Sequence, residues 1–290
     1  MLKTSWSEFS DDDCTLLAAA LAYYTAFSLP SILLIVLYVA GSVFGRAAVQ
    51  GEIHNSIASM VGPGIGTMVQ GMVRSAAESA TGGLVATALG VLGLLFSATT
   101  TLSALQTAMN RAWEVKPDES GIKSMAWKRF ISFLLIVGAG ILVLISVGAT
   151  TAATGLAGAA GIAFPGWLMY VLEICVSWFV FMLIFAVLFK VLPDARLRFG
   201  DMTAGAMVTA TLFIIGKFAI GFYLSHSTIS NAFGAAGALA LLLLWTYYSA
   251  LIFLFGVEFT QVWARDHGRS IEPEPGAVKV IREEKPPKAA

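Results

Sequence analysis

Long apolar runs separated by short polar segments dominate the pattern of hydrophobic and polar positions along this chain. A helix that crosses the hydrocarbon core of a bilayer needs about 20 mostly apolar residues. Six windows reach this length, so the pattern predicts an all-α polytopic membrane protein with six transmembrane helices. The predicted spans are about 28–45, 84–108, 130–152, 166–190, 202–224 and 235–262, in one membrane domain over residues 1–264.

The composition and the period of the pattern agree with helices in lipid. Hydrophobic residues make up 57% of the 290 positions and charged residues 12%, which is more apolar surface than a soluble domain of this size can bury. A membrane β-barrel would show stretches of roughly ten residues that alternate between apolar and polar side chains. The runs here are apolar at even and odd positions alike, which favours helices.

Two segments outside the spans have their own patterns. Residues 47–80 are too polar to cross a membrane, but their apolar positions recur at helical spacing on both sides of Gly62-Pro63-Gly64. This predicts outer-side amphipathic helices over 47–80, with a simple packed hairpin as the alternative. Residues 265–290 combine four prolines with many charges, and this composition predicts a disordered cytoplasmic tail.

The distribution of Lys and Arg predicts the orientation. Fifteen of the 18 basic residues fall in segments that share one side of the membrane if the chain crosses it six times. Only Arg46 and Arg74 fall on the other side, and Lys217 lies inside a span. Because basic loops stay in the cytoplasm, both termini are expected there. The formal net charge is zero, which argues against a nucleic-acid partner.

Three ionisable residues inside the predicted spans are candidate functional residues: Glu173, Lys217 and Glu258. Counted from the outer ends of their spans, Glu173 and Lys217 lie at similar depths. We therefore expect them to approach each other as a buried ion pair, since pairing offsets the desolvation of each charge. The pair would either contact a substrate or simply lock two helices together.

A polar stripe follows one face of the second predicted span. Thr99, Ser103, Gln106 and Asn110 are separated by four, three and four residues and lead to Arg111 at the cytoplasmic end. Glu258 is expected to join Asn110 or Arg111 in an inner polar cluster. With the outer pair, this stripe predicts a polar path through the bundle. The alternative is interhelical hydrogen bonding worth only about 1 kcal/mol per bond.

Motifs for cofactors and catalysis are not found in the sequence. The chain has no phosphate-binding glycine loop, no His-Glu-x-x-His and no Gly-x-Ser-x-Gly, so no catalytic residue and no cofactor are assigned. His54 and His226 are expected on the same outer side, but two ligands do not make a metal site. Cys14 and Cys175 provide neither a disulfide framework nor a metal-binding pair.

Several short landmarks, in this order and spacing, resemble the YihY/BrkB family of bacterial inner-membrane proteins, some members of which carry an older ribonuclease BN label. They are Ala-Ala-Ala-Leu-Ala-Tyr-Tyr at 18–24, Ala-Leu-Gln at 104–106, Asn-Arg-Ala-Trp at 110–113, Leu-Pro-Asp at 192–194, Gly-Ala-Ala-Gly at 234–237 and Gly-Val-Glu-Phe at 256–259. The resemblance implies six spans with cytoplasmic termini, and no settled activity. Phe233 and Val257 are mild departures from the family pattern.

The ribonuclease label does not fit the chemistry of the chain. RNA hydrolysis would call for metal-binding carboxylates, a histidine pair or a basic groove for a single strand, and the predicted cytoplasmic loops carry none of these. We therefore expect a protein that is not an enzyme.

The leading hypothesis is a permease-like or lipid/solute-handling protein, with membrane lipids as partners and a lipid or small solute as substrate. The alternative is a non-transporting scaffold that assembles envelope machinery through its outer helices and basic inner loops.

Overall fold

The computed structural model of this chain describes residues 1–45, 51, 70–71, 100–117, 134, 138–146, 148, 165–226 and 229–280. For residues 30–44, 221, 223–226 and 229–238 it describes the backbone alone.

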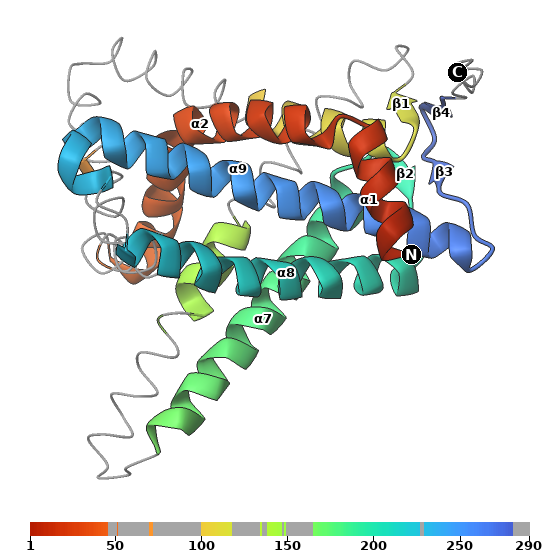
Figure 1. The fold of residues 1–290 in the computed structure, drawn as a ribbon. Helices are drawn as coiled ribbons and strands as arrows, with labels where there is room; N and C mark the ends of the chain where they lie inside the picture. The colour runs from red at the N-terminus through yellow and green to blue at the C-terminus, as the bar shows by residue number, and fades with distance from the viewer. Residues whose placement is uncertain are drawn as a thin grey trace.

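Long helices make up most of this part of the chain (Figure 1). The labelled helices are α1 (Leu2–Asp11), α2 (Cys14–Phe44), α7 (Gly166–Val191), α8 (Phe199–His226) and α9 (Ile229–Asp266). A further helix covers residues 100–112, and another covers 138–146. The strands are β1 (Val115–Pro117), β2 (Ala195–Arg196), β3 (Glu272–Pro273) and β4 (Ala277–Lys279).

Three of the described helices are long and apolar enough to cross a membrane: Gly166–Val191, Phe199–Ile220 and Leu239–Asp266. They overlap the spans predicted at 166–190, 202–224 and 235–262, so this part of the chain has the helical membrane architecture that the sequence predicts. The span predicted at 28–45 lies almost entirely within α2. Of the other two predicted spans, residues 84–99 of the first and residues 130–133, 135–137, 147 and 149–152 of the second lie outside the described residues, as does nearly all of the amphipathic segment 47–80.

Helix α9 is the centre of the bundle. It packs along α2 on one side and α8 on the other, while α1 crosses one end of α9 and α7 packs against α8 (Figure 1). The largest fully buried side chains include Trp113, Phe189 and Leu254, which come from the turn after the 100–112 helix, from α7 and from α9. The apolar core therefore joins segments that are far apart in the sequence.

The short strands tie the connections between helices together. β1 pairs antiparallel with β4, which sets Lys116 opposite Val278, and β2 pairs antiparallel with β3, which sets Arg196 opposite Glu272. Both pairs lie at the same end of the bundle as α1 and the N-terminus (Figure 1). We call this end of the bundle the terminal end.

The prediction of a disordered tail from residue 265 is wrong for residues 265–280. Helix α9 continues to Asp266, and the chain then forms β3 and β4. Backbone donors of this segment find acceptors on earlier segments: the Glu274 amide donates to the Asp194 carbonyl at 2.9 Å, and the Val280 amide to the Glu114 carbonyl at 2.8 Å. Tail composition does not reveal these distant partners. Residues 281–290 lie outside the described residues.

Candidate functional site

Glu258 is the central ionisable residue of the bundle. It lies on α9 inside a candidate span, and its side chain has no exposed surface. The thiol of Cys14 donates to its Oε1 at 3.5 Å, and the carboxyl group of Asp12 lies beside it. Among the described residues, no donor reaches Oε2 of Glu258. A buried carboxyl group with an unsatisfied oxygen is costly, which makes this residue a candidate for function.

The turn between α1 and α2 brings Asp12 and Cys14 to Glu258. Asp13 adopts a positive φ of 52°, a conformation that Asp tolerates better than most residues, and the chain reverses there so that α1 crosses α9. Asp12 is 2% exposed and Cys14 is fully buried. Cys14 lies ahead of the span predicted at 28–45. Burial, reinforced by the charge of Glu258, raises the pKa of its thiol above the usual value, so the thiol stays a neutral donor.

The predicted partners of Glu258 are wrong, because α1 and the start of α2 cover this part of α9. Arg111 instead pairs with Asp13 at 2.9 Å, and both side chains are exposed. A second exposed pair joins Arg265 to Glu8 at 2.8 Å. Exposed pairs of this kind contribute about 0–1 kcal/mol each, so they orient α1 more than they stabilise it.

Asn110 and Gln106 meet a residue that the sequence analysis did not select. The side-chain amides of Asn110 and Gln106 donate to Oδ2 of Asp194 at 2.8 and 2.9 Å, and the Asp194 backbone amide donates to Oδ1 of Asn110 at 2.9 Å. Asn110 and Asp194 are 5% and 3% exposed. The part of the polar stripe formed by Gln106 and Asn110 thus holds the 100–112 helix to the end of α7.

The rest of the stripe is less centrally placed. Ser103 is half-buried, and Thr99 lies outside the described residues. On the opposite face of this helix, Thr101 donates to the hydroxyl of Ser28 on α2 at 2.8 Å. A neighbouring helix therefore satisfies this hydroxyl group, which is not part of the stripe.

Glu173 and Lys217 do not come together. Glu173 is exposed on α7, Lys217 is half-buried on α8, and no ion pair joins them in the part of the chain that the structure describes. The predicted buried ion pair is not observed, because the outer part of α7 diverges from the bundle (Figure 1). The described residues also contain no group of three or more His, Cys, Asp or Glu able to hold a metal ion.

Sequence reasoning missed Asp194 as the partner of Gln106 and Asn110. It also missed Asp12 and Cys14 as the neighbours of Glu258. Asp194 follows Leu192-Pro193, where a span ends, and a carboxylate at that point was a usable signal. Asp12 belongs to an acidic run that is typical of a helix start. Nothing in the local pattern indicates that Cys14 faces a glutamate 244 residues later.

Comparison with known proteins identifies the family. Residues 5–280 match the family model described as Virulence factor BrkB. This chain belongs to the BrkB family. Asp12, Cys14, Asn110, Asp194 and Glu258 all lie inside the region that matches the BrkB model.

The similar curated relatives are UPF0761 membrane proteins. The chain is 29% identical over 256 residues to one from Psychrobacter sp. (strain PRwf-1), and this alignment covers 87% of the chain but only 46% of that relative. It is 27% identical over 251 residues to one from Alteromonas mediterranea, covering 86% of the chain and 83% of the relative. No solved structure matches. These names describe membrane proteins and state no enzymatic activity.

Proposed function

We propose that this BrkB-family chain is a bacterial inner-membrane protein that handles a lipid or small solute in a permease-like manner. The substrate would move along polar groups of the helix bundle. The buried carboxyl group of Glu258 carries the proposal, because a charged or polar group inside a span is expensive and persists where it serves an ion or substrate.

The strand pairs support six spans. Two paired strands must lie on the same side of a membrane, so the chain crosses it an even number of times between them. Between β2 and β3 these crossings are α8 and α9. Between β1 and β4 they include α7, α8 and α9, so an even total needs a further crossing within residues 118–165, where the sequence predicts 130–152.

The N-terminal contacts give the same parity. Arg111 pairs with Asp13, so residues 14–110 also cross an even number of times, which fits predicted spans at 28–45 and 84–108. The segments gathered at the terminal end are those with most of the basic residues. The positive-inside rule then favours a cytoplasmic location for this end.

The proposed polar path is strongest at the terminal end. Glu258, Asp12 and Cys14 lie together there, with Arg111 near enough to influence the Cys14 thiol electrostatically. Glu173 and Lys217 would act separately toward the outer side, since they form no pair within the described residues. Thr99, Ser103, Gln106 and Asn110 would line or support the connection between the two ends.

A catalytic role is not part of the proposal. Cys14 and Glu258 are the closest nucleophile and acid in the described cluster, but the thiol is fully buried and held neutral. A buried neutral thiol is a poor nucleophile.

Flux measurements in liposomes test the proposal. The full chain is reconstituted with NBD-labelled phosphatidylglycerol, whose outer-leaflet fraction is bleached by dithionite, and separate vesicles contain the dye pyranine to report proton movement. We expect faster lipid or proton movement than in protein-free vesicles. Glu258→Gln should slow it about tenfold, which corresponds to about 1.4 kcal/mol on the barrier.

Asp266→Asn is the matched control, because Asp266 is an exposed acid two turns further along α9. It should leave the rates unchanged. Rates equal to those of protein-free vesicles, or equal rates for wild type and Glu258→Gln, would refute the proposed path.

The second candidate is a non-transporting scaffold of the cell envelope. It is favoured by Asp194, which satisfies both Gln106 and Asn110, because a stripe whose groups bond within the protein needs no water-filled path. Partner proteins that copurify with the full chain and are lost on deletion of residues 51–80, together with no flux, would support this function.

A further inference from the structure

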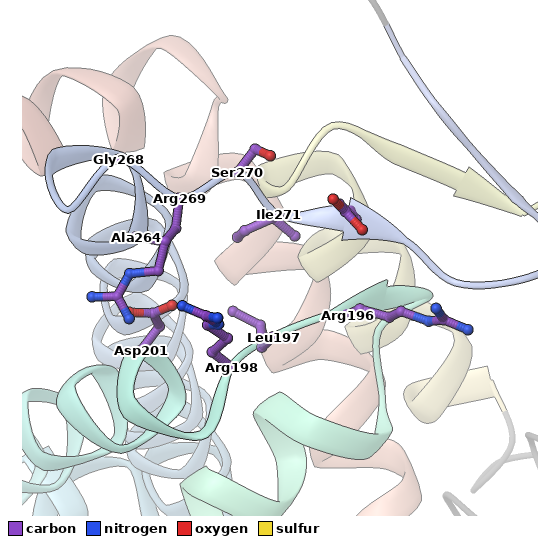
Figure 2. Close-up of a pocket in the computed structure, with 10 residues that line it drawn as sticks. Arg196, Leu197, Arg198, Asp201, Ala264, Gly268, Arg269, Ser270 and Ile271 are labelled. Atoms are coloured by element: carbon purple, nitrogen blue, oxygen red, sulfur yellow. The ribbon is translucent and has the colours of Figure 1, made fainter.

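A pocket of about 410 Å³ lies at the terminal end, where the start of α8 faces the residues that follow α9 (Figure 2). Its charged lining residues are Arg196, Arg198, Asp201, Arg269 and Glu272. Ser270 adds a hydroxyl group to the lining. The polar cluster around Glu258 does not contribute to this pocket, so the two sites are distinct.

A Schellman turn at the end of α9 places Arg269 in the pocket. The Arg269 amide donates to the Ala264 carbonyl at 2.9 Å and the Gly268 amide to the Arg265 carbonyl at 3.0 Å, which is the hydrogen-bond pattern of this motif. Gly268 has the positive φ of 67° that the motif requires. The chain thus reverses, and Arg269 Nη1 reaches Asp201 Oδ1 at 2.9 Å on the first turn of α8.

Arg198 leaves the pocket with unbalanced positive charge. The Asp201 carboxylate is 3% exposed and is already neutralised by Arg269. Arg198 is exposed and points toward this pair (Figure 2), yet no carboxylate pairs with it in the described part of the chain. The other lining carboxylate, Glu272, lies opposite Arg196 in the β2–β3 pair, so among these described residues Arg198 remains as the cation without a carboxylate of its own. A bound anion would balance this cation, and guanidinium groups suit phosphate oxygens because they donate in a fixed planar fork.

The pocket lies at the depth of lipid headgroups if α8 spans the membrane. The candidate span in α8 begins at Phe199, directly after Arg198. Phe199 is 72% exposed, and the ammonium group of Lys190 lies 5.3 Å from its ring centroid. Exposed aromatic and cationic side chains together are typical of the membrane–water boundary.

We propose that this pocket binds a phosphate group through Arg198 and Arg269, and that an anionic phospholipid headgroup supplies it. Asp201 acts as a positioning residue that holds Arg269 toward the ligand. The site is independent of the proposed path. If the protein binds phosphatidylglycerol but moves neither lipid nor protons, the proposed path alone is refuted. If it moves lipid but does not prefer phosphatidylglycerol over phosphatidylcholine, the proposed phosphate site alone is refuted.

Native mass spectrometry of the purified full chain in detergent tests the site. Phosphatidylglycerol and phosphatidylcholine of the same chain length are added in parallel, and bound lipid is counted. We expect preferential retention of phosphatidylglycerol. Arg198→Gln should weaken it about tenfold, as for the loss of a hydrogen bond to a charged group. Lys279→Gln, which removes an exposed cation of β4 outside the pocket, should not.

Inorganic phosphate distinguishes the two sources of the ligand. If phosphate displaces phosphatidylglycerol from the wild type, the pocket recognises the phosphate group in either form. If it does not, while Arg198→Gln still weakens lipid binding, the lipid headgroup is the ligand. Equal losses of phosphatidylglycerol retention in Arg198→Gln and Lys279→Gln would overturn the proposal. Equal binding of phosphatidylglycerol and phosphatidylcholine, together with a melting temperature that phosphate does not change, would also overturn it.

Discussion

Gly256 of α9 lies directly against the hydroxyl group of Thr209 on α8. A Cβ atom at position 256 would overlap that hydroxyl and come within 2.9 Å of the Thr209 Cβ. The contact is reciprocal, since a Cβ at Gly205 of α8 would overlap the hydroxyl of Thr260 on α9. Each threonine hydroxyl donates to the carbonyl of the glycine four residues earlier on its own helix, at 2.7 Å. Small residues thus let α8 and α9 approach closely.

Gly256→Ala should therefore destabilise the bundle. Overpacking a tight contact costs about 1–3 kcal/mol. The upper part of this range outweighs the gain of about 1 kcal/mol in helix propensity that Ala has over Gly. The measurement is the melting temperature in detergent, and we expect it to fall. Gly138→Ala is the control, because a Cβ there meets nothing within 4 Å. Equal melting temperatures for the two variants would show that the α8–α9 contact tolerates a methyl group.

The bonds of Asp194 give a graded prediction. Asn110→Ala removes two hydrogen bonds to Asp194, and Gln106→Ala removes one. Since a hydrogen bond to a charged group contributes about 1.5–3 kcal/mol, Asn110→Ala should lower the melting temperature more than Gln106→Ala. Thr107→Ala is a control on the same helix, because Thr107 is exposed and donates only to a carbonyl of its own helix. A larger loss in Gln106→Ala than in Asn110→Ala would contradict this account.

The sequence predicts the spanning helices well and their polar contacts poorly. The spans ending near Val191 and Asp266 follow from apolar length alone. Lipid offers no hydrogen-bond partners, so the backbone groups of a span must bond to one another within a helix. The stripe of Gln106 and Asn110 was also readable, since helical spacing fixes which residues share a face.

The partner of the Gln106 and Asn110 stripe could not be predicted from the sequence. Asp194 meets the stripe through the packing of α7 against distant segments, and periodicity carries no information on that pairing. The same holds for Asp12 and Cys14 beside Glu258, which depend on how α1 crosses α9. The expected Glu173–Lys217 pair rested on equal depth, but equal depth does not set the direction in which two helices face each other.

Gly268→Ala should disturb the phosphate pocket without any steric clash. A Cβ at this position meets nothing within 4 Å, but the φ of 67° costs a non-glycine residue about 1 kcal/mol. We expect a small loss in melting temperature and weaker retention of phosphatidylglycerol, because Arg269 follows the turn. Gly166→Ala, at an open position at the start of α7, should change neither. Unchanged lipid retention in Gly268→Ala would mean that the turn does not position Arg269.

The raised pKa of Cys14 predicts slow thiol chemistry. In a Cys175→Ala background, Cys14 should react with N-ethylmaleimide at least about tenfold more slowly than a cysteine introduced by Thr15→Cys in a cysteine-free chain, because the neutral thiol is unreactive. The unfolded thiol ionises near its usual value of 9.0, whereas the folded thiol does not. The stability that depends on this group is thus complete below that pH and declines as the pH rises above it. Equal rates for the two cysteines would refute the buried contact with Glu258.

The β1–β4 pair predicts a crosslink and its side of the membrane. Lys116 and Val278 are opposite residues in an antiparallel pair, at a separation that suits a disulfide. Lys116→Cys with Val278→Cys, in a cysteine-free chain, should therefore oxidise to an intramolecular disulfide in native vesicles, visible as a shift on a non-reducing gel. Lys116→Cys with Arg196→Cys, which lies in the other strand pair, is the mismatched control. The single Lys116→Cys variant should react with a membrane-impermeant maleimide only in inside-out vesicles, because the proposed orientation places the terminal end in the cytoplasm. Labelling in right-side-out vesicles would reverse the topology, and crosslinking of the mismatched pair alone would contradict the register of β1 and β4.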